Sequence, residues 1–229
     1  MYRPKINFQQ LYAAFNENIF NFDCGQKCEK YNLTGKPFCC DICEAIPTAY
    51  DQEWHYLQKN TDLWHVWNKN DCNADQPNLK IVETDLVDYQ ILIACKGPAD
   101  CIRNYRAISC RQFPFFPYIT QDFRFLGMAY EWHFESKCWV INHLHLVRNE
   151  YRKQFITFYD QLFSKWPDDM ESYASLSDQM RVAFIERKKR IPILHRNGHS
   201  YLLSPKNEKL ERIDPTQYQK YGVYKHEIS

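Results

Sequence analysis

Cysteine is the residue type of this chain best suited to chemistry, and eight of the ten cysteines fall into two clusters. The front cluster lies within residues 22–43, FDCGQKCEKYNLTGKPFCCDIC, and the rear cluster within residues 95–115. Thiolates that converge on one point are the usual ligands of structural zinc and of iron–sulfur clusters. We therefore expect a metal centre, holding zinc or an iron–sulfur cluster, whose candidate ligands are Cys24, Cys28, Cys39, Cys40, Cys43, Cys95, Cys101 and Cys110.

The spacing within the front cluster favours chelation from a tight loop. Three residues separate Cys24 from Cys28, and two separate Cys40 from Cys43. Such spacings let neighbouring sulfurs reach one ion. Cys39 directly precedes Cys40, and consecutive side chains point in different directions, so this doublet suits either two neighbouring centres or one ligand beside a bystander. Nearby lysines and arginines are expected to temper the charge of the thiolates.

Composition favours a folded protein of the cytoplasm. Hydrophobic residues make up 45% of the 229 positions and aromatic residues 16%, and the formal net charge is +1. This balance gives no reason to expect nucleic acid or a membrane as a partner. The N-terminal segment has no signal-peptide pattern, and no apolar run approaches the roughly 18 to 20 residues of a membrane span. Reduced thiols in the cytoplasm favour metal ligation over disulfides, and Cys72, in a polar loop at 68–78, is expected to be a free thiol.

The fold class expected is α+β and mainly helical, in a single domain over residues 1–229. An irregular, cysteine-rich metal-binding core covers residues 22–116, and a helical and hairpin extension covers 117–229. Apolar periodicity predicts helices over 49–67, with Thr48 as N-cap, and over 85–97, 150–166 and 172–190. A strand is the alternative for 85–97.

A small antiparallel β component is expected near the C-terminal half. β-branched and aromatic residues favour strands over 122–134 and 137–147, and a mixed structure is the alternative for the second segment. Asn197 and Gly198 predict a tight type I′ turn in a C-terminal hairpin over 191–203.

The rear cluster and part of the front cluster resemble the YkgJ-like cysteine-cluster proteins, a family of zinc- or iron-chelating domains. The resemblance covers about residues 22–116. Its front part rests on a Cys-x-x-x-Cys pair and a Cys-Cys doublet, Cys24, Cys28, Cys39 and Cys40. Its rear part rests on Cys95, Cys101, Ile102, Tyr105, Arg106, Cys110, Arg111, Phe113 and Pro114. Relatives of this family that resemble flagellin lysine N-methylase imply an iron–sulfur enzyme.

Three functions are compatible with these patterns. The first is a metal-binding protein of the cytoplasm. The second is an iron–sulfur-dependent enzyme, methyltransferase-like or an oxidoreductase, in which His143 and His145 on one face of a strand are candidate chemical groups beside Glu131, His133 and Cys138. The third is a metal-stabilised interaction module that binds an unidentified protein partner through aromatic residues such as Phe113, Phe115 and Phe116.

Overall fold

The cysteine-rich part of the chain is built around a short antiparallel sheet. The computed structural model describes residues 3–72 and 87–226. The chain forms two compact units. The first, which we call the thiol unit, comprises Lys5–Asn16 and Asp23–Phe113. The second, the meander unit, comprises Met1–Pro4, Glu17–Phe22 and Pro114–Ser229.

Strand β3, Gln90–Cys95, is the centre of the sheet in the thiol unit. It pairs antiparallel with β1, Thr48–Tyr50, on one side and with β2, Trp64–Val66, on the other. Ile93 and Ala94 are buried in this sheet. The register sets Trp64 opposite Cys95, so the end of the central strand carries a thiol beside an aromatic ring.

Short helices surround this sheet in the thiol unit. The α-helices are α1 (Phe8–Ala14), α2 (Gly25–Cys28), α3 (Asp51–Asn60) and α5 (Ile108–Gln112). Single 3-10 turns are η1 (Glu29–Tyr31), η2 (Phe38–Cys40), η3 (Lys69–Asp71), η4 (Pro98–Asp100) and η5 (Arg103–Tyr105). The single helix predicted over 49–67 is wrong, because β1, α3 and β2 divide that segment, and Thr48 lies in β1 rather than at an N-cap.

The carboxylate of Glu53, in α3, is a buried connection within the thiol unit. It accepts hydrogen bonds from the Tyr12 hydroxyl at 2.6 Å, from the Ile108 backbone N–H at 2.7 Å and from the Tyr50 backbone N–H at 3.2 Å. One side chain therefore joins α1, β1, α3 and α5. Each donor is satisfied in a place that water does not reach.

The meander unit contains a five-stranded antiparallel sheet in the order β4-β5-β6-β7-β8. Its strands are Phe115–Ile119, Phe125–Tyr130, Ile191–His195, Ser200–Leu203 and Leu210–Arg212. Strands β6 and β7 form the predicted hairpin, and its turn holds Asn197 and Gly198. The turn is not of the predicted type I′, because the His195 N–H donates to the His199 carbonyl and Gly198, but not Asn197, has a positive φ. Every residue of β4 and β5 is buried, which explains why these strands read as continuous apolar runs.

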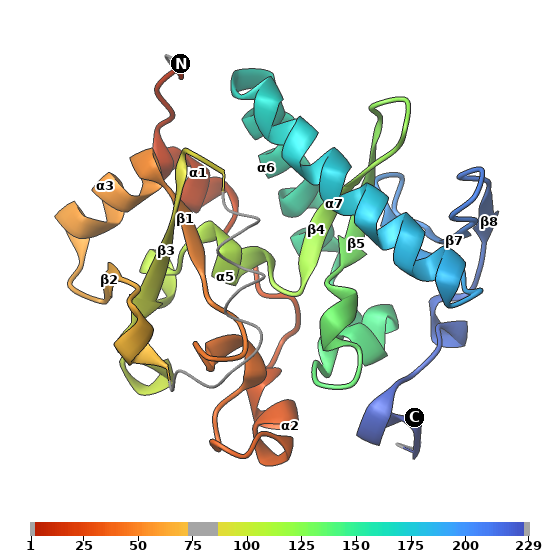
Figure 1. Cartoon of the computed structure of the whole chain (residues 1–229), viewed down its shortest axis with the longest axis horizontal. Helices are drawn as coiled ribbons and strands as arrows, with labels where there is room; N and C mark the ends of the chain where they lie inside the picture. The colour runs from red at the N-terminus through yellow and green to blue at the C-terminus, as the bar shows by residue number, and fades with distance from the viewer. Residues whose placement is uncertain (1–2, 73–86, 227–229) are drawn as a thin grey trace. The chain divides into compact units, whose positions relative to one another are not determined.

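Two long helices, which lie between β5 and β6 in the sequence, pack against this sheet (Figure 1). Helix α6 spans Asn149–Lys165 and α7 spans Pro167–Glu186. Ser177 of α7 accepts a hydrogen bond from the Ile119 backbone N–H at 2.9 Å, which holds α7 to the edge strand β4. The remaining 3-10 segments are η6 (Trp132–Phe134), η7 (Val140–Leu146), η8 (Pro215–Gln217) and η9 (Gly222–His226).

The predicted fold class, mainly helical with a small β component around a cysteine-rich metal-binding core, is wrong. The described residues form two antiparallel sheets, of three and five strands. The segment predicted as a helix over 85–97 contributes β3, and the part of that prediction before residue 87 lies outside the described residues. A short apolar run such as residues 91–94 is compatible with a buried strand as well as with a helix. The segment is a strand because it pairs with β1 on one side and with β2 on the other.

Candidate metal centre

Sulfur atoms from the front and rear clusters line one cavity of about 60 Å³ within the thiol unit. The apolar part of its wall consists of Ile42, Pro47, Leu63 and Trp64. Each thiol comes from a short structured segment or from its end: η2, the end of β3, the end of η4 and α5. The lining thiols are Cys39, Cys40, Cys95, Cys101 and Cys110.

The front loop is held in place by polar contacts. The buried Asp41 accepts hydrogen bonds from the Thr34 hydroxyl at 2.7 Å, the Asn32 amide at 2.9 Å and the Cys43 backbone N–H at 3.2 Å. Burial opposes the charge of Asp41, but these donors outweigh it and lower the pKa of the carboxyl. The η2 turn that carries the cysteine doublet therefore rests on an ionised, internally bonded carboxylate.

Arg106 provides the positive charge at the cavity. Its Nε donates to the sulfur of Cys101 at 3.1 Å. Burial disfavours the charge of Arg106, yet the hydrogen bond to Cys101 and the nearby thiols raise the pKa of the guanidinium. A fixed cation beside several sulfurs favours their ionised forms.

The thiols of the cavity differ in acidity. The sulfur atoms of Cys39 and Cys40 lie 3.9 Å apart, and the hydrogen bond from Cys39, helped by Arg106, lowers the pKa of Cys40 despite burial. Burial, together with the neighbouring thiol of Cys40, raises the pKa of Cys95 and of Cys110. Among Cys40, Cys95 and Cys110, the environment therefore favours the ionised form only for Cys40.

Cys24 is the N-cap of α2, and Cys28 is the last residue of that helix. Neither residue lines the cavity. Burial, followed by the charges of Asp23 and Cys28, raises the pKa of Cys24 to about 12. Burial also raises the pKa of Cys28, which feels the charge of Cys40. The front pair is therefore electrostatically coupled to the cavity without facing it.

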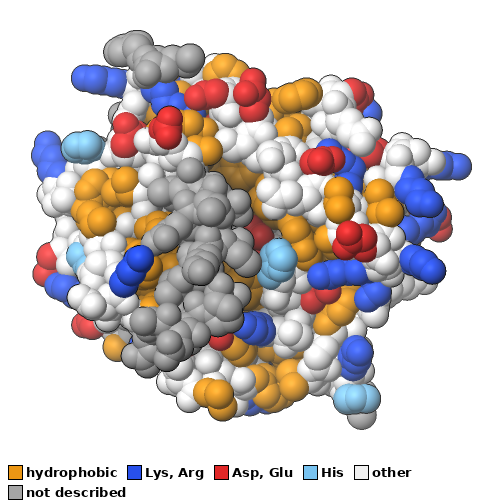
Figure 2. Space-filling view, in the orientation of Figure 1, with side chains coloured by type: hydrophobic (Ala, Val, Ile, Leu, Met, Phe, Trp, Pro, Cys, Tyr) orange, Lys and Arg blue, Asp and Glu red, His pale blue; other side chains and the backbone are white. Residues whose placement is uncertain are grey.

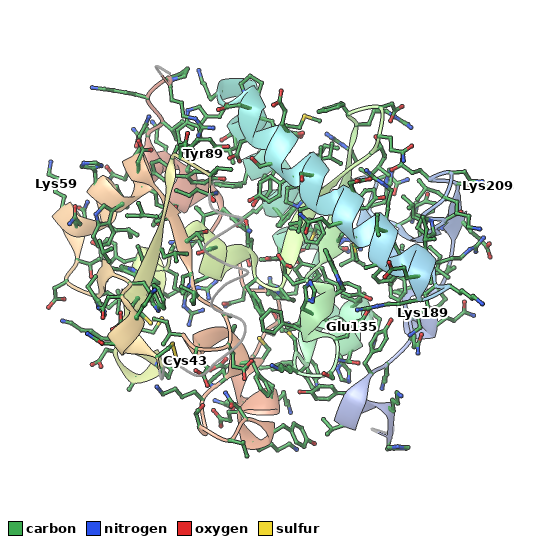
Figure 3. The ribbon with its side chains drawn as sticks, viewed as in Figure 1. Cys43, Lys59, Tyr89, Glu135, Lys189 and Lys209 are labelled. Carbon is green, nitrogen blue, oxygen red and sulfur yellow. A yellow bond between two sulfur atoms is a disulfide. The ribbon has the colours of Figure 1, made fainter. Side chains whose placement is uncertain are left out.

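Cys43 forms a disulfide with Cys72. The prediction of Cys72 as a free thiol is wrong, and Cys43, predicted as a ligand, has its sulfur bonded elsewhere. The rest of the predicted polar loop, beyond Cys72, lies outside the described residues. Figure 3 labels Cys43. The remaining eight cysteines are not in disulfides.

The described side chains around the cavity do not form a complete metal site. Within residues 3–72 and 87–226, no three His, Cys, Asp or Glu side chains are arranged as a group that could hold an ion in their present positions. The chemistry of the lining nevertheless suits a soft cation, since five thiols surround one small space beside an arginine. Their sulfurs would have to converge further on binding, as they do where metal binding and folding are coupled.

His143, one of the histidines predicted as candidate chemical groups, is packed in the core of the meander unit. The strand predicted over 137–147 is wrong, because Val140–Leu146 forms η7. His143 is buried, stacks on Trp139 with ring centroids 3.8 Å apart, and donates from Nδ1 to the Trp139 carbonyl at 2.9 Å. His143 and His145 are therefore not arranged on one strand face, and the ring of His143 packs as part of the core.

Trp64 is the lining residue whose position the sequence did not indicate. The sequence places Trp64 in the helix predicted over 49–67, whereas β2 sets it opposite Cys95. Its indole N–H donates to the Tyr105 carbonyl at 2.8 Å, which ties β2 to the rear cluster. Only the pairing of β2 with β3 reveals this neighbour, so no signal local to Trp64 could have found it.

Fold and site together define an α+β protein with a thiol-lined cavity and a separate antiparallel meander. Comparisons with protein families, with curated proteins and with solved structures found no match to this chain. Among the helices of the described residues, none has both the length and the apolar character that crossing a membrane requires.

Proposed function

We propose that the protein binds zinc or an iron–sulfur cluster through the thiols of the cavity. The observation that carries the proposal is the gathering of Cys39 and Cys40 from the front cluster with Cys95, Cys101 and Cys110 from the rear cluster around one space. Cys24 and Cys28, coupled electrostatically to this group, are the further candidate ligands. The resemblance of the two clusters to YkgJ-like proteins supports the same conclusion.

The size of the cavity favours an inorganic occupant over an organic substrate. Pockets for organic ligands typically enclose about 300 to 1,000 Å³, whereas this cavity encloses about 60 Å³. A metal held there would compensate the charge of several thiolates that otherwise oppose one another's ionisation. Arg106 would keep the thiol of Cys101 oriented and share its charge. Apolar neighbours such as Trp64 would limit access of water.

A metal-dependent interaction module has less support. Phe115 and Phe116, the aromatic residues proposed to contact a partner, are 1% and 0% exposed in strand β4. Acidic and basic side chains are interspersed among the coloured residues of the face in Figure 2, which does not favour a polyanionic partner such as nucleic acid. The partner-binding hypothesis would therefore need another surface.

Elemental analysis and a visible spectrum of anaerobically purified protein test the proposal. Zinc predicts a colourless protein with stoichiometric metal, and an iron–sulfur cluster predicts a brown, oxygen-sensitive one. Cys101→Ser and Cys110→Ser should each lose most of the bound metal. Cys138→Ser is the matched control, because Cys138 is buried in the meander unit and should retain it. A metal-free protein that stays folded in chelator would overturn the proposal.

A further inference from the structure

A second cavity, of about 420 Å³, lies within the meander unit and is lined by basic residues. Its walls are the first turns of α6 and the turn of the β6–β7 hairpin. Arg152 and Lys153 come from the helix, and His195 and Arg196 from the hairpin. Neither the cysteines nor the metal proposal involves this part of the chain.

The positive charge of this cavity is not fully compensated by carboxylates. Arg152 donates to two carbonyl oxygens, of His199 at 3.0 Å and of His195 at 3.3 Å, which fix its guanidinium without neutralising it. Burial lowers the pKa of Arg152, so its charge is held at an energetic cost. Arg196 pairs with Asp160 at 3.0 Å. Lys153 adds a further charge on an exposed side chain.

Two other features make the lining of this cavity suitable for an anion. The backbone N–H of Asn197 donates to Nδ1 of His195 at 3.1 Å, so the neutral imidazole carries its proton on Nε2. This leaves Nε2–H as a donor. The cavity also faces the N-terminal turn of the 17-residue helix α6, where the helix dipole is positive. Ile156 and Leu194 supply an apolar part of the lining.

We propose that this cavity binds a small organic phosphate. The phosphoryl group would meet Lys153, Arg152 and the His195 imidazole, and the organic part would contact Ile156 and Leu194. Arginine and lysine are the residues that bind phosphate by charge-assisted hydrogen bonds. A volume of about 420 Å³ has room for the organic part as well as the phosphoryl group.

Isothermal titration calorimetry of the full chain at low ionic strength tests the proposal, with glycerol phosphate and inorganic phosphate as probes. Saturable binding of glycerol phosphate is expected, and Lys153→Met should weaken it about tenfold. Lys165→Met is the matched control, because Lys165 is an exposed lysine at the other end of α6, and it should leave affinity unchanged.

The two probes distinguish the source of the phosphoryl group. Tighter binding of glycerol phosphate than of inorganic phosphate supports an organic phosphate, and equal affinity supports the anion site with free phosphate as its ligand. Absence of saturable binding by either probe, or an equal loss of affinity in Lys165→Met, would overturn the proposal. Because Lys153 is exposed, its replacement should leave folding intact, which a thermal melt would verify.

Discussion

Arg106 is the cationic residue that lines the cavity together with the thiols. Its Nε–H lies 3.1 Å from the sulfur of Cys101, and it also lowers the pKa of Cys40. Groups that hydrogen-bond to a metal ligand, without binding the metal, commonly change metal affinity by about 10- to 100-fold. Arg106→Met should therefore lower the affinity for the proposed metal by about that factor, measured by competition with a chromophoric chelator.

The control for this measurement is Arg124→Met, since Arg124 is an exposed arginine of the meander unit paired with Asp122. This variant should keep the affinity of the unaltered protein. Equal affinities for Arg106→Met and the unaltered protein would show that the guanidinium does not act on the metal ligands.

Glu53 makes the stability of the thiol unit dependent on pH. Burial raises the pKa of its carboxyl from 4.5 to about 7, although the Tyr12 hydroxyl, the Ile108 and Tyr50 N–H groups and the nearby Arg111 favour ionisation. A raised folded-state pKa stabilises the fold below the unfolded pKa, and this contribution disappears as the pH rises through the folded pKa. The free energy of unfolding should fall by up to about 3 kcal/mol between pH 4.5 and pH 7.

Urea denaturation at a series of pH values measures this slope. Glu53→Gln should reduce the slope, because the variant side chain does not titrate, and should leave the contribution of Glu131, whose pKa burial also raises to about 7. Glu150→Gln, an exposed glutamate on α6, should preserve it. An unchanged slope in Glu53→Gln would assign the pH dependence to another group.

At the scale of elements, the approach of β5 to β6 depends on a glycine. Gly127 has φ of +149°, and a Cβ there would lie 2.4 Å from the Leu194 carbonyl oxygen and 2.8 Å from the His195 Cα. Both contacts are with backbone, which cannot move without breaking the strand pairing. Gly127→Ala should reduce the free energy of unfolding by about 3 kcal/mol or more, measured by urea denaturation.

Gly198 provides the comparison within the same sheet. It also has a positive φ, of +88°, but nothing lies within 4 Å of the position of a Cβ. Gly198→Ala should cost only about 1 kcal/mol, which is the strain of the left-handed backbone alone. If both variants lost the same stability, the close approach at Gly127 would not be the cause.

The elements that the sequence predicted well have an unambiguous period. Helix α6, which the sequence predicts over 150–166, buries one face that holds Tyr151, Phe155, Phe158, Tyr159 and Leu162. In contrast, the apolar run of β3 is compatible with a helix as well as with a buried strand. Hydrogen bonds to β1 and β2 make it a strand. Segment 140–146 is rich in strand-forming residues, yet it forms the 3-10 segment η7, in which His143 stacks on Trp139. Long-range packing overrides local preference in both cases.

At the scale of the whole molecule, the proposed metal should stabilise one unit more than the other. All thiols of the cavity belong to the thiol unit, whereas β4 to β8 belong to the meander unit. Binding energy at a structural metal site acts as folding energy for the elements that supply its ligands. Treatment with chelator should therefore increase amide hydrogen exchange in β3 and α5, with little change in β5 and β6.

Mass spectrometry of peptides from each unit measures this exchange. A second sample treated with metal-saturated chelator controls for direct effects of the reagent. A uniform increase across both units would mean that the metal stabilises the chain globally, and no increase in β3 would contradict a metal site at Cys95.

The cysteine spacing predicted eight ligands, of which Cys39, Cys40, Cys95, Cys101 and Cys110 line one cavity and Cys24 and Cys28 do not. The front and rear clusters are separated in sequence, and β3 with its partner strands brings Cys95 to the same cavity as Cys39 and Cys40. The same spacing included Cys43 among the ligands, whereas its partner is Cys72, 29 residues away. Pairing at that distance depends on the folded path of the chain, which spacing does not encode.

The bond between Cys43 and Cys72 turns the 29-residue separation between them into a covalent ring. A protease that cuts one peptide bond inside this ring, for example near the exposed Lys59, would leave the two pieces attached to each other. Such nicked protein should migrate as a single band on a non-reducing gel and separate into two bands after addition of dithiothreitol. Two bands without reductant would mean that the ring is open in the isolated protein.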